Sequence, residues 1–210
     1  TNVVLKNGRD SDTVWFDQNT TDPEQRFKMG VYAGGGMFSL LRSADGIHWN
    51  KAGAGAKTGD RSTFFYNPFR ERWVFSIRSG SKRGRSRDYW ETKDFFSFTA
   101  DVTEKKQAVP WLVSDTGDWK RDDLQSQPQL YNVDCAAYES LMVGLFVIWR
   151  GDYRGSKTTP KATELDQLGR PKQNSLCIGF SRDGFYWDRP NRQPFVATSE
   201  KPGDWNWGNV

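Results

Sequence analysis

Short runs of apolar and polar residues, separated by turns rich in glycine, asparagine and aspartate, make up most of this chain. Residues 10–17, Asp-Ser-Asp-Thr-Val-Trp-Phe-Asp, recur as residues 60–67, Asp-Arg-Ser-Thr-Phe-Phe-Tyr-Asn. Each copy is followed by a second strand-like run, at 26–32 and at 72–78. Runs of β-branched and aromatic residues bounded by turn residues are typical of strands. The chain therefore contains an internal repeat built from strands.

A seven-residue turn pattern closes the repeating unit. It occurs as Ser43-Ala-Asp-Gly-Ile-His-Trp49, Thr92-Lys-Asp-Phe-Phe-Ser-Phe98 and Ser181-Arg-Asp-Gly-Phe-Tyr-Trp187. Asp-Gly supplies the residue with positive φ that a tight turn needs, and the short Ser, Thr and Asp side chains can bond the turn backbone. Repeats of about 50 residues made of short strands predict a β-propeller with one blade per repeat.

The predicted fold is all-β: a propeller of four-stranded antiparallel blades, forming a single domain over residues 1–210. Blade one covers about 10–50, blade two about 60–99 and blade three about 134–188, and a fourth blade begins near the C-terminus. Three blades leave open sheet edges. We therefore expect a ring that is completed by a missing segment or by a second chain.

Strands are expected at 12–17, at 26–32 and at 37–42, the last two forming a hairpin. Two connecting segments are expected to lack strands: a Gly/Ala-rich linker at 52–59, and a polar loop at 99–130. Blade three should open with the most apolar run of the chain, which extends from Ala136 to Trp149.

The aromatic content of the chain favours β-sheets, and core packing explains most of these rings. Aromatic residues make up 15% of the chain and hydrophobic residues 36%, enough for a sizeable core. Flat aromatic rings also match the apolar C–H face of a sugar ring. The net charge of +4 is mild, and the one dense basic cluster, residues 82–87, is interpreted as a solvated loop, with an anion contact or a nucleic-acid site as alternatives. We expect no nucleic-acid or membrane partner.

Cysteine and histidine exclude several site classes. Cys135 and Cys177 lie in apolar runs without metal-ligand spacing, which favours two buried free thiols over a disulfide. The only histidine, His48, is expected on an outer strand in a structural role. One histidine supports neither a Ser-His-Asp triad nor a zinc site.

Four carboxylates occur where the innermost strand of a blade is expected to begin: Asp10 and Asp12, Asp60, and Glu139. In a propeller these strand starts gather around one mouth of the channel. Such a cluster suits glycoside hydrolysis, in which one carboxylic acid protonates the leaving oxygen while a carboxylate activates water or attacks the sugar. The sequence does not decide between retention and inversion of the anomeric configuration.

Each of these carboxylates also has a structural interpretation. Asp10 and Asp12 could be turn or cap residues. A charge such as Glu139 inside an apolar run costs several kcal/mol unless it is paired or faces water, so a buried pair with Arg61 or Arg150 is the alternative to a functional role.

The motifs at 10–17 and 60–68, the Asp-Gly-x-x-Trp turns and Tyr138-Glu-Ser140 together resemble the five-bladed propeller glycoside hydrolases of families 32 and 43. The sequence looks most like uncharacterised bacterial proteins similar to the family 32 N-terminal domain. The resemblance implies that Asp12 or Asp10 is the base or nucleophile, that Asp60 modulates the acid, and that Glu139 is the general acid. The Trp-x-Asn-Asp-Pro-Asn signature of family 32 is absent, so a fructan substrate is not implied.

We therefore expect a glycosidase that acts on a poly- or oligosaccharide, outside the cytoplasm of a bacterium. A propeller that binds carbohydrate without cleaving it, or that serves as a scaffold, is the alternative. The residues expected to bind substrate are Trp15, Arg61, Tyr138, Trp149 and Arg150. No cofactor is expected, and a structural cation in the propeller channel stays open.

Overall fold

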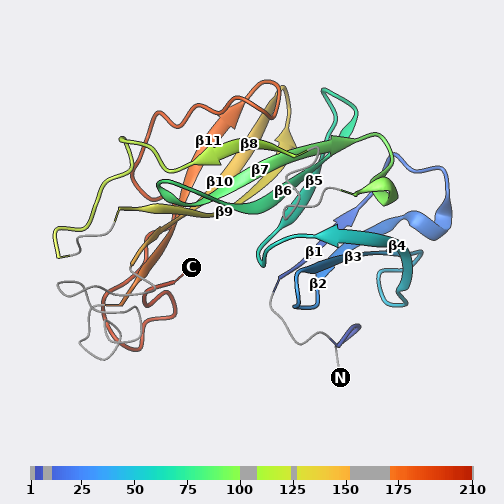
Figure 1. Ribbon diagram of the computed structural model, residues 1–210, viewed down its shortest axis with the longest axis horizontal. Helices are drawn as coiled ribbons and strands as arrows, with labels where there is room; N and C mark the ends of the chain where they lie inside the picture. Colours follow the sequence, from blue (N-terminus) through green and yellow to red (C-terminus); the bar gives the residue numbers. More distant parts are fainter. Residues whose placement is uncertain (1–2, 7–10, 100–107, 124–126, 152–170, 210) are drawn as a thin grey trace. The chain divides into compact units, whose positions relative to one another are not determined.

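The computed structural model of the chain, shown in Figure 1, describes residues 3–6, 11–99, 108–123, 127–151 and 171–209. Its regular structure consists of β-strands in three sheets and two short 3₁₀ helices, with antiparallel pairing in every register given below. The prediction of an all-β fold is confirmed, whereas the arrangement of the sheets as propeller blades stays a prediction.

The chain divides into two compact units. The first comprises residues 1–79 and 88–110, and the second comprises residues 80–87 and 111–210. Within the described part of the chain, no helix has the length and hydrophobicity that crossing a bilayer requires.

The first sheet is a four-stranded meander whose spatial order follows the sequence. It contains β1 (Asp12–Phe16), β2 (Phe27–Tyr32), β3 (Met37–Ser43) and β4 (Asn50–Lys57), and the 3₁₀ helix η1 (Pro23–Gln25) lies between β1 and β2. The strands predicted at 12–17, 26–32 and 37–42 are confirmed within a residue or two.

The predicted linker at 52–59 is wrong, because most of it belongs to β4. At Gly53 the small residue is explained by crowding, because an added Cβ would lie 3.3 Å from both Leu40 and the carbonyl oxygen of Phe96. Gly55 has a φ of 71° next to a register shift in the β3–β4 pairing. Glycine and alanine thus mark a tightly packed, irregular strand.

The second sheet has the order β5 (Thr63–Asn67), β6 (Arg72–Ser81), β7 (Gly84–Thr92) and β8 (Val109–Val113), with the 3₁₀ helix η2 (Phe95–Ser97) after β7. The prediction of one loop over 99–130 is wrong at β8, because Val-Pro-Trp-Leu-Val pairs as the fourth strand.

The basic cluster at 82–87 is a hairpin rather than a solvated loop. Arg87 is fully buried and donates a hydrogen bond to the carbonyl oxygen of Tyr131. The guanidinium of Arg85 lies over the ring of Trp149, 4.2 Å from its centroid. Both arginines are therefore packing residues of the second unit.

The third sheet has the order β11 (Gln173–Ser181), β10 (Leu141–Arg150) and β9 (Gln129–Tyr138). The apolar segment from Ala136 to Trp149 is thus not one strand. It is the end of β9, a two-residue turn and β10, which pair with Leu141 opposite Tyr138.

The two units differ in their core. The first has an aromatic core that includes Phe38, Phe64, Trp73, Phe75 and Phe98, with Phe75 and Phe98 stacked at 4.0 Å between centroids. In the second unit the buried residues of β9 and β10 include Leu130, Val133, Met142, Phe146 and Ile148. Cys135 and Cys177 are buried and free, as predicted.

Candidate functional site

The structure brings the starts of β1 and β5 together. The backbone N–H of Arg61 donates to Oγ of Ser11 at 3.1 Å. Asp12 is the first residue of β1, and Asp60 precedes Arg61 just before β5. We call Ser11, Asp12, Asp60 and Arg61 the strand-start site. It joins the corresponding ends of the two sequence repeats, as the repeat pattern predicted.

Backbone strain accompanies this contact. Arg61 has a φ of 59°, in the left-handed region that residues with a side chain rarely occupy. Two other non-glycine residues, Glu71 and Glu139, share this conformation among the described residues, and both lie in turns between paired strands. Arg61 lies instead in the turn that enters β5, where its conformation accompanies the bond to Ser11. Strain of this kind, about 1–3 kcal/mol, is often found at functional sites.

Asp60 is held by an ion pair with Arg78. The side chains of Asp60 and Arg78 are 25% and 37% exposed, so the pair borders solvent. The stem of Arg78 lies against Gly59, where a Cβ would come within 2.7 Å of it. Asp12 is exposed at the same strand ends. Asp10 lies outside the described residues.

Glu139 occupies a different environment from the one predicted. It is exposed, with a φ of 51°, in the two-residue turn between β9 and β10. The alternative of a buried pair with Arg61 or Arg150 is therefore wrong, and so is the premise that Glu139 interrupts a buried strand. Its role as general acid stays a prediction.

Of the predicted substrate-binding aromatics, Tyr138 is 69% exposed at the end of β9. Trp15 is half-buried and meets Trp73 edge to face, so it belongs to the aromatic packing of the first unit. Trp149 is 2% exposed and lies beneath the guanidinium of Arg85, so its burial does not support a substrate contact.

Arg150 is 2% exposed, which likewise does not support contact with a substrate at the surface. Its guanidinium lies 3.7 Å from the ring centroid of Trp119, and its Nε donates to the Trp119 carbonyl oxygen at 3.0 Å. Burial lowers the pKa of Arg150 from its usual value. The interactions with Trp119 are those of a buried packing arginine.

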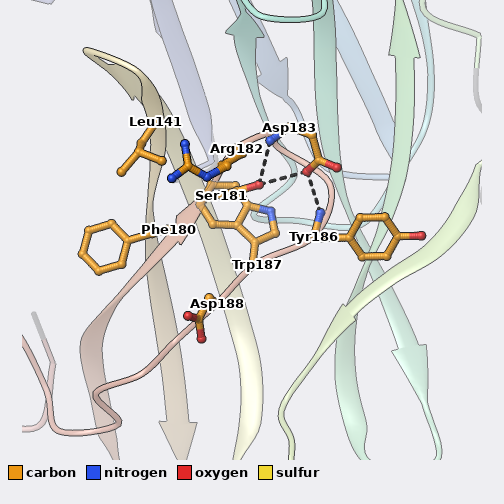
Figure 2. A pocket seen from close by; sticks show the side chains of 8 residues that line it. All are labelled: Leu141, Phe180, Ser181, Arg182, Asp183, Tyr186, Trp187 and Asp188. Carbon is orange, nitrogen blue, oxygen red and sulfur yellow. Dashed lines mark hydrogen bonds between the residues drawn. The ribbon is translucent and has the colours of Figure 1, made fainter.

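A pocket of about 520 Å³ lies in the second unit at the turn 181–187, which we call the second Asp-Gly turn. Figure 2 shows Trp187 between Phe180 and Leu141 on one side and Tyr186 on the other. The lining is Leu141, Phe180, Ser181, Arg182, Asp183, Tyr186, Trp187 and Asp188. We call this hollow the Trp187 pocket.

Asp183 fixes the backbone beneath the pocket. Its Oδ1 accepts the backbone N–H groups of Phe185 at 2.8 Å and Tyr186 at 2.9 Å, and the hydroxyl of Ser181 at 3.0 Å. Although partial burial alone would raise the pKa of Asp183, these hydrogen bonds hold that pKa below its usual range. The carboxylate is thereby committed to the turn.

Sequence reasoning attributed this turn to structure and did not single out Arg182, Tyr186 or Asp188. A signal was present in the repeat itself. We call residues 43–49 the first Asp-Gly turn. At the positions that correspond to Arg182, Tyr186 and Asp188, this turn and the residue after it have Ala44, His48 and Asn50.

The described part of the chain offers no ready set of side chains for binding a metal ion. Among the residues that the structure describes, no group of three or more His, Cys, Asp or Glu side chains is arranged to hold a metal ion.

Comparison with solved structures shows a distant structural likeness. No family model matches the chain, and no curated protein matches its sequence. The fold is similar to the crystal structure of an N-acetylgalactosamine deacetylase from F. plautii in complex with blood group B trisaccharide, with a TM-score of 0.54 and 13% identity. The match covers 90% of this chain and 53% of the other, so this chain spans about half the length of that enzyme. A likeness at this identity concerns the fold alone.

Proposed function

We propose that this chain acts on carbohydrate and hydrolyses glycosidic bonds, with carboxylates of the strand-start site taking part. The observation that carries the proposal is the hydrogen bond from the Arg61 N–H to Ser11, which joins the ends of two repeats. A carboxylate adjoins each partner of that bond, Asp12 beside Ser11 and Asp60 beside Arg61. The distant likeness to a carbohydrate-acting enzyme supports the substrate class.

The proposed chemistry is that of paired carboxylates. Asp12 acts as base or nucleophile at the anomeric carbon, and Asp60, held by Arg78, orients the reacting groups. The general acid, which protonates the glycosidic oxygen as the C–O bond breaks, stays predicted to be Glu139, a residue of the second unit. Its exposure leaves the carboxylate accessible to a substrate. A carboxylate separation of about 5 Å gives retention, and about 6.5–9.5 Å leaves room for a water molecule and gives inversion.

One other reaction class has support of its own. The similar solved structure is a deacetylase, which favours removal of an acetyl group from an amino sugar as the second candidate. Binding of carbohydrate without turnover is the third.

The test is an assay of the purified chain on a panel of poly- and oligosaccharides, with released reducing ends and released acetate measured in parallel. Glu139→Gln and Asp12→Asn should each lower reducing-end release by about 10² to 10⁴, the usual contribution of a general acid or base. Glu24→Gln is the matched control, because Glu24 is an exposed carboxylate elsewhere in the first unit.

The three outcomes separate cleanly. Reducing ends lost in both variants and kept in the control support the glycosidase. Acetate without reducing ends replaces it with the deacetylase. Sugar binding with neither product leaves the non-catalytic alternative.

A further inference from the structure

Tyr186 is an aromatic side chain that the core does not explain. It is 77% exposed, yet it packs edge to face on Phe185, with 5.1 Å between ring centroids. The backbone of Phe185 is itself fixed, because Nε1 of Trp111 donates a hydrogen bond to the Phe185 carbonyl oxygen at 2.7 Å. An exposed ring on a fixed support loses little conformational entropy when it binds a partner.

Trp187 forms the centre of the pocket and is held just as firmly. Its ring lies over Gly144, where an added Cβ would come within 2.7 Å of the indole, and meets Phe146 edge to face at 5.6 Å. Its Nε1 donates to the Gly184 carbonyl oxygen at 3.2 Å. Because its N–H is used, the part of the indole that lines the pocket offers apolar surface.

The polar groups of the pocket nearly balance in charge. Arg182 and Asp188 are exposed and of opposite sign, while Asp183 is committed through Oδ1 to the turn. A guanidinium can donate to hydroxyl groups of a ligand, and a carboxylate can accept from them. They give no net positive charge that would select an anion, so the matching ligand is neutral and rich in hydroxyls.

We propose that the Trp187 pocket binds a neutral pyranose unit of a glycan, with an aromatic ring against the sugar's C–H face and Arg182 and Asp188 on its hydroxyls. This rests on the proposed function only in taking carbohydrate as the ligand. The binding surface continues toward Tyr138, because Leu141 lines the pocket and pairs with Tyr138 across the β9–β10 turn. The pocket lies wholly in the second unit, whereas the strand-start site lies in the first.

The test measures sugar binding to the full chain by saturation-transfer NMR and calorimetry. The probes are the methyl glycosides of glucose, galactose and N-acetylgalactosamine, together with blood group B trisaccharide. Tyr186→Ala should weaken binding by about tenfold or more, as loss of an aromatic anchor usually does. Tyr186→Phe should restore most of it, and Asp188→Asn should weaken it less.

His48→Ala is the matched control, because His48 occupies the position of Tyr186 in the first Asp-Gly turn and is also exposed. It should leave sugar binding unchanged, and circular dichroism should show all variants folded. The proposal is overturned if no probe binds at 10 mM, or if the affinity is the same in Tyr186→Ala and the parent chain.

Failure of the pocket and failure of the hydrolase give different results. Binding that depends on Tyr186, with no product released from any glycan, supports the pocket and removes the hydrolase. Product release that depends on Asp12, with sugar binding that is unchanged in Tyr186→Ala, supports the hydrolase and overturns the pocket proposal.

Discussion

The two Asp-Gly turns have the same skeleton and different surfaces. In each, the glycine N–H donates to the serine Oγ, at 2.9 Å in the first turn and 2.8 Å in the second. The fifth residue donates its N–H to the aspartate Oδ1 at 2.8 Å in both, and the glycine has a φ of 76° in both. The final tryptophan donates to the glycine carbonyl oxygen at 3.0 and 3.2 Å.

The residues outside this skeleton set the two turns apart. The second turn has Arg182 and Tyr186 where the first has Ala44 and His48, and it lines a pocket of about 520 Å³. Four positions thus fix the backbone, and the others are free to carry a function. The comparison shows that the same Ser-Asp-Gly-Trp turn can serve a purely structural role or support the residues of a binding pocket.

The tryptophans show a second difference. Trp49 packs against the aliphatic cluster of Met29, Val31 and Leu41, whereas Trp187 lies over the bare backbone of Gly144. The second turn therefore depends on a glycine in a neighbouring strand.

The largest effect should come from Gly144→Ala, which breaks this dependence. The new Cβ would lie 2.7 Å from Trp187 and 2.8 Å from Phe146, so both rings must move. Overpacking of this kind costs about 1–3 kcal/mol. Urea unfolding followed by tryptophan fluorescence should show the loss, and sugar binding should weaken with it.

Gly80→Ala is the control for this change, because Gly80 lies in a strand and an added Cβ there meets nothing within 4 Å. It should change stability by less than about 1 kcal/mol. Equal losses in the two variants would show that the contact with Trp187 is not the cause.

A smaller effect should appear in the acid sensitivity of the turns. Hydrogen bonds lower the pKa of Asp183, against the effect of burial, and lower that of Asp45, where the N–H of His48 contributes most. A lowered pKa in the folded state adds stability above the unfolded value, about 3.9 for Asp, which is lost as the pH falls through the folded value. The stability gap between the parent chain and Asp183→Asn, about 1 kcal/mol at pH 7, should therefore shrink below about pH 4.

Asp45→Asn should show the same sign with a smaller gap, since Asp45 is more exposed and water screens its interactions. Melting curves of the three proteins between pH 2.5 and 7 measure both gaps. A gap for Asp183 that stays constant across this range would contradict a role for its charge in the turn.

The sequence predicted the skeleton of these turns because it depends on local chemistry. Ser, Asp and Gly at fixed spacing specify the turn without tertiary contacts, and the repeat specified strands such as β1 and β5 in the same way. The sequence did not predict the features that contacts between distant residues determine. Gly53 is small because Leu40 and the backbone at Phe96 crowd it. The sequence pattern predicted a linker at this glycine, whereas the structure has strand β4 there.

The candidate site was predictable in the same uneven way. Asp10 and Asp60 stand at matching positions of the repeat, so the nearness of the two strand starts could be inferred. The turn at Glu139 was hidden because Glu-Ser is a weak turn signal between two apolar strands, and no local pattern marks a left-handed Glu. Tyr186 was missed because its role depends on Leu141 and Phe180, which come from other parts of the sheet.

The smallest effect should come from moving the variable residues alone. Ala44→Arg with His48→Tyr gives the first turn the side chains of the second and keeps its Ser, Asp, Gly and Trp. It removes the solvent-exposed contact between His48 Nδ1 and Asp45 Oδ2 at 2.7 Å. The melting temperature should stay within about 2 °C of the parent, as for most surface substitutions. No new sugar site should appear, because Arg42 and Asn50 stand where the pocket has Phe180 and Asp188.

The reciprocal variant, Arg182→Ala with Tyr186→His, should abolish most sugar binding at equally small cost in melting temperature. Together the two variants separate the skeleton from the surface, because both turns keep Ser, Asp, Gly and Trp. If the first turn gained sugar affinity, two side chains on a rigid turn would be enough and the walls of the pocket would be incidental. If the second turn kept its affinity, the walls alone would bind the sugar, and Tyr186 would be an exposed ring without a ligand.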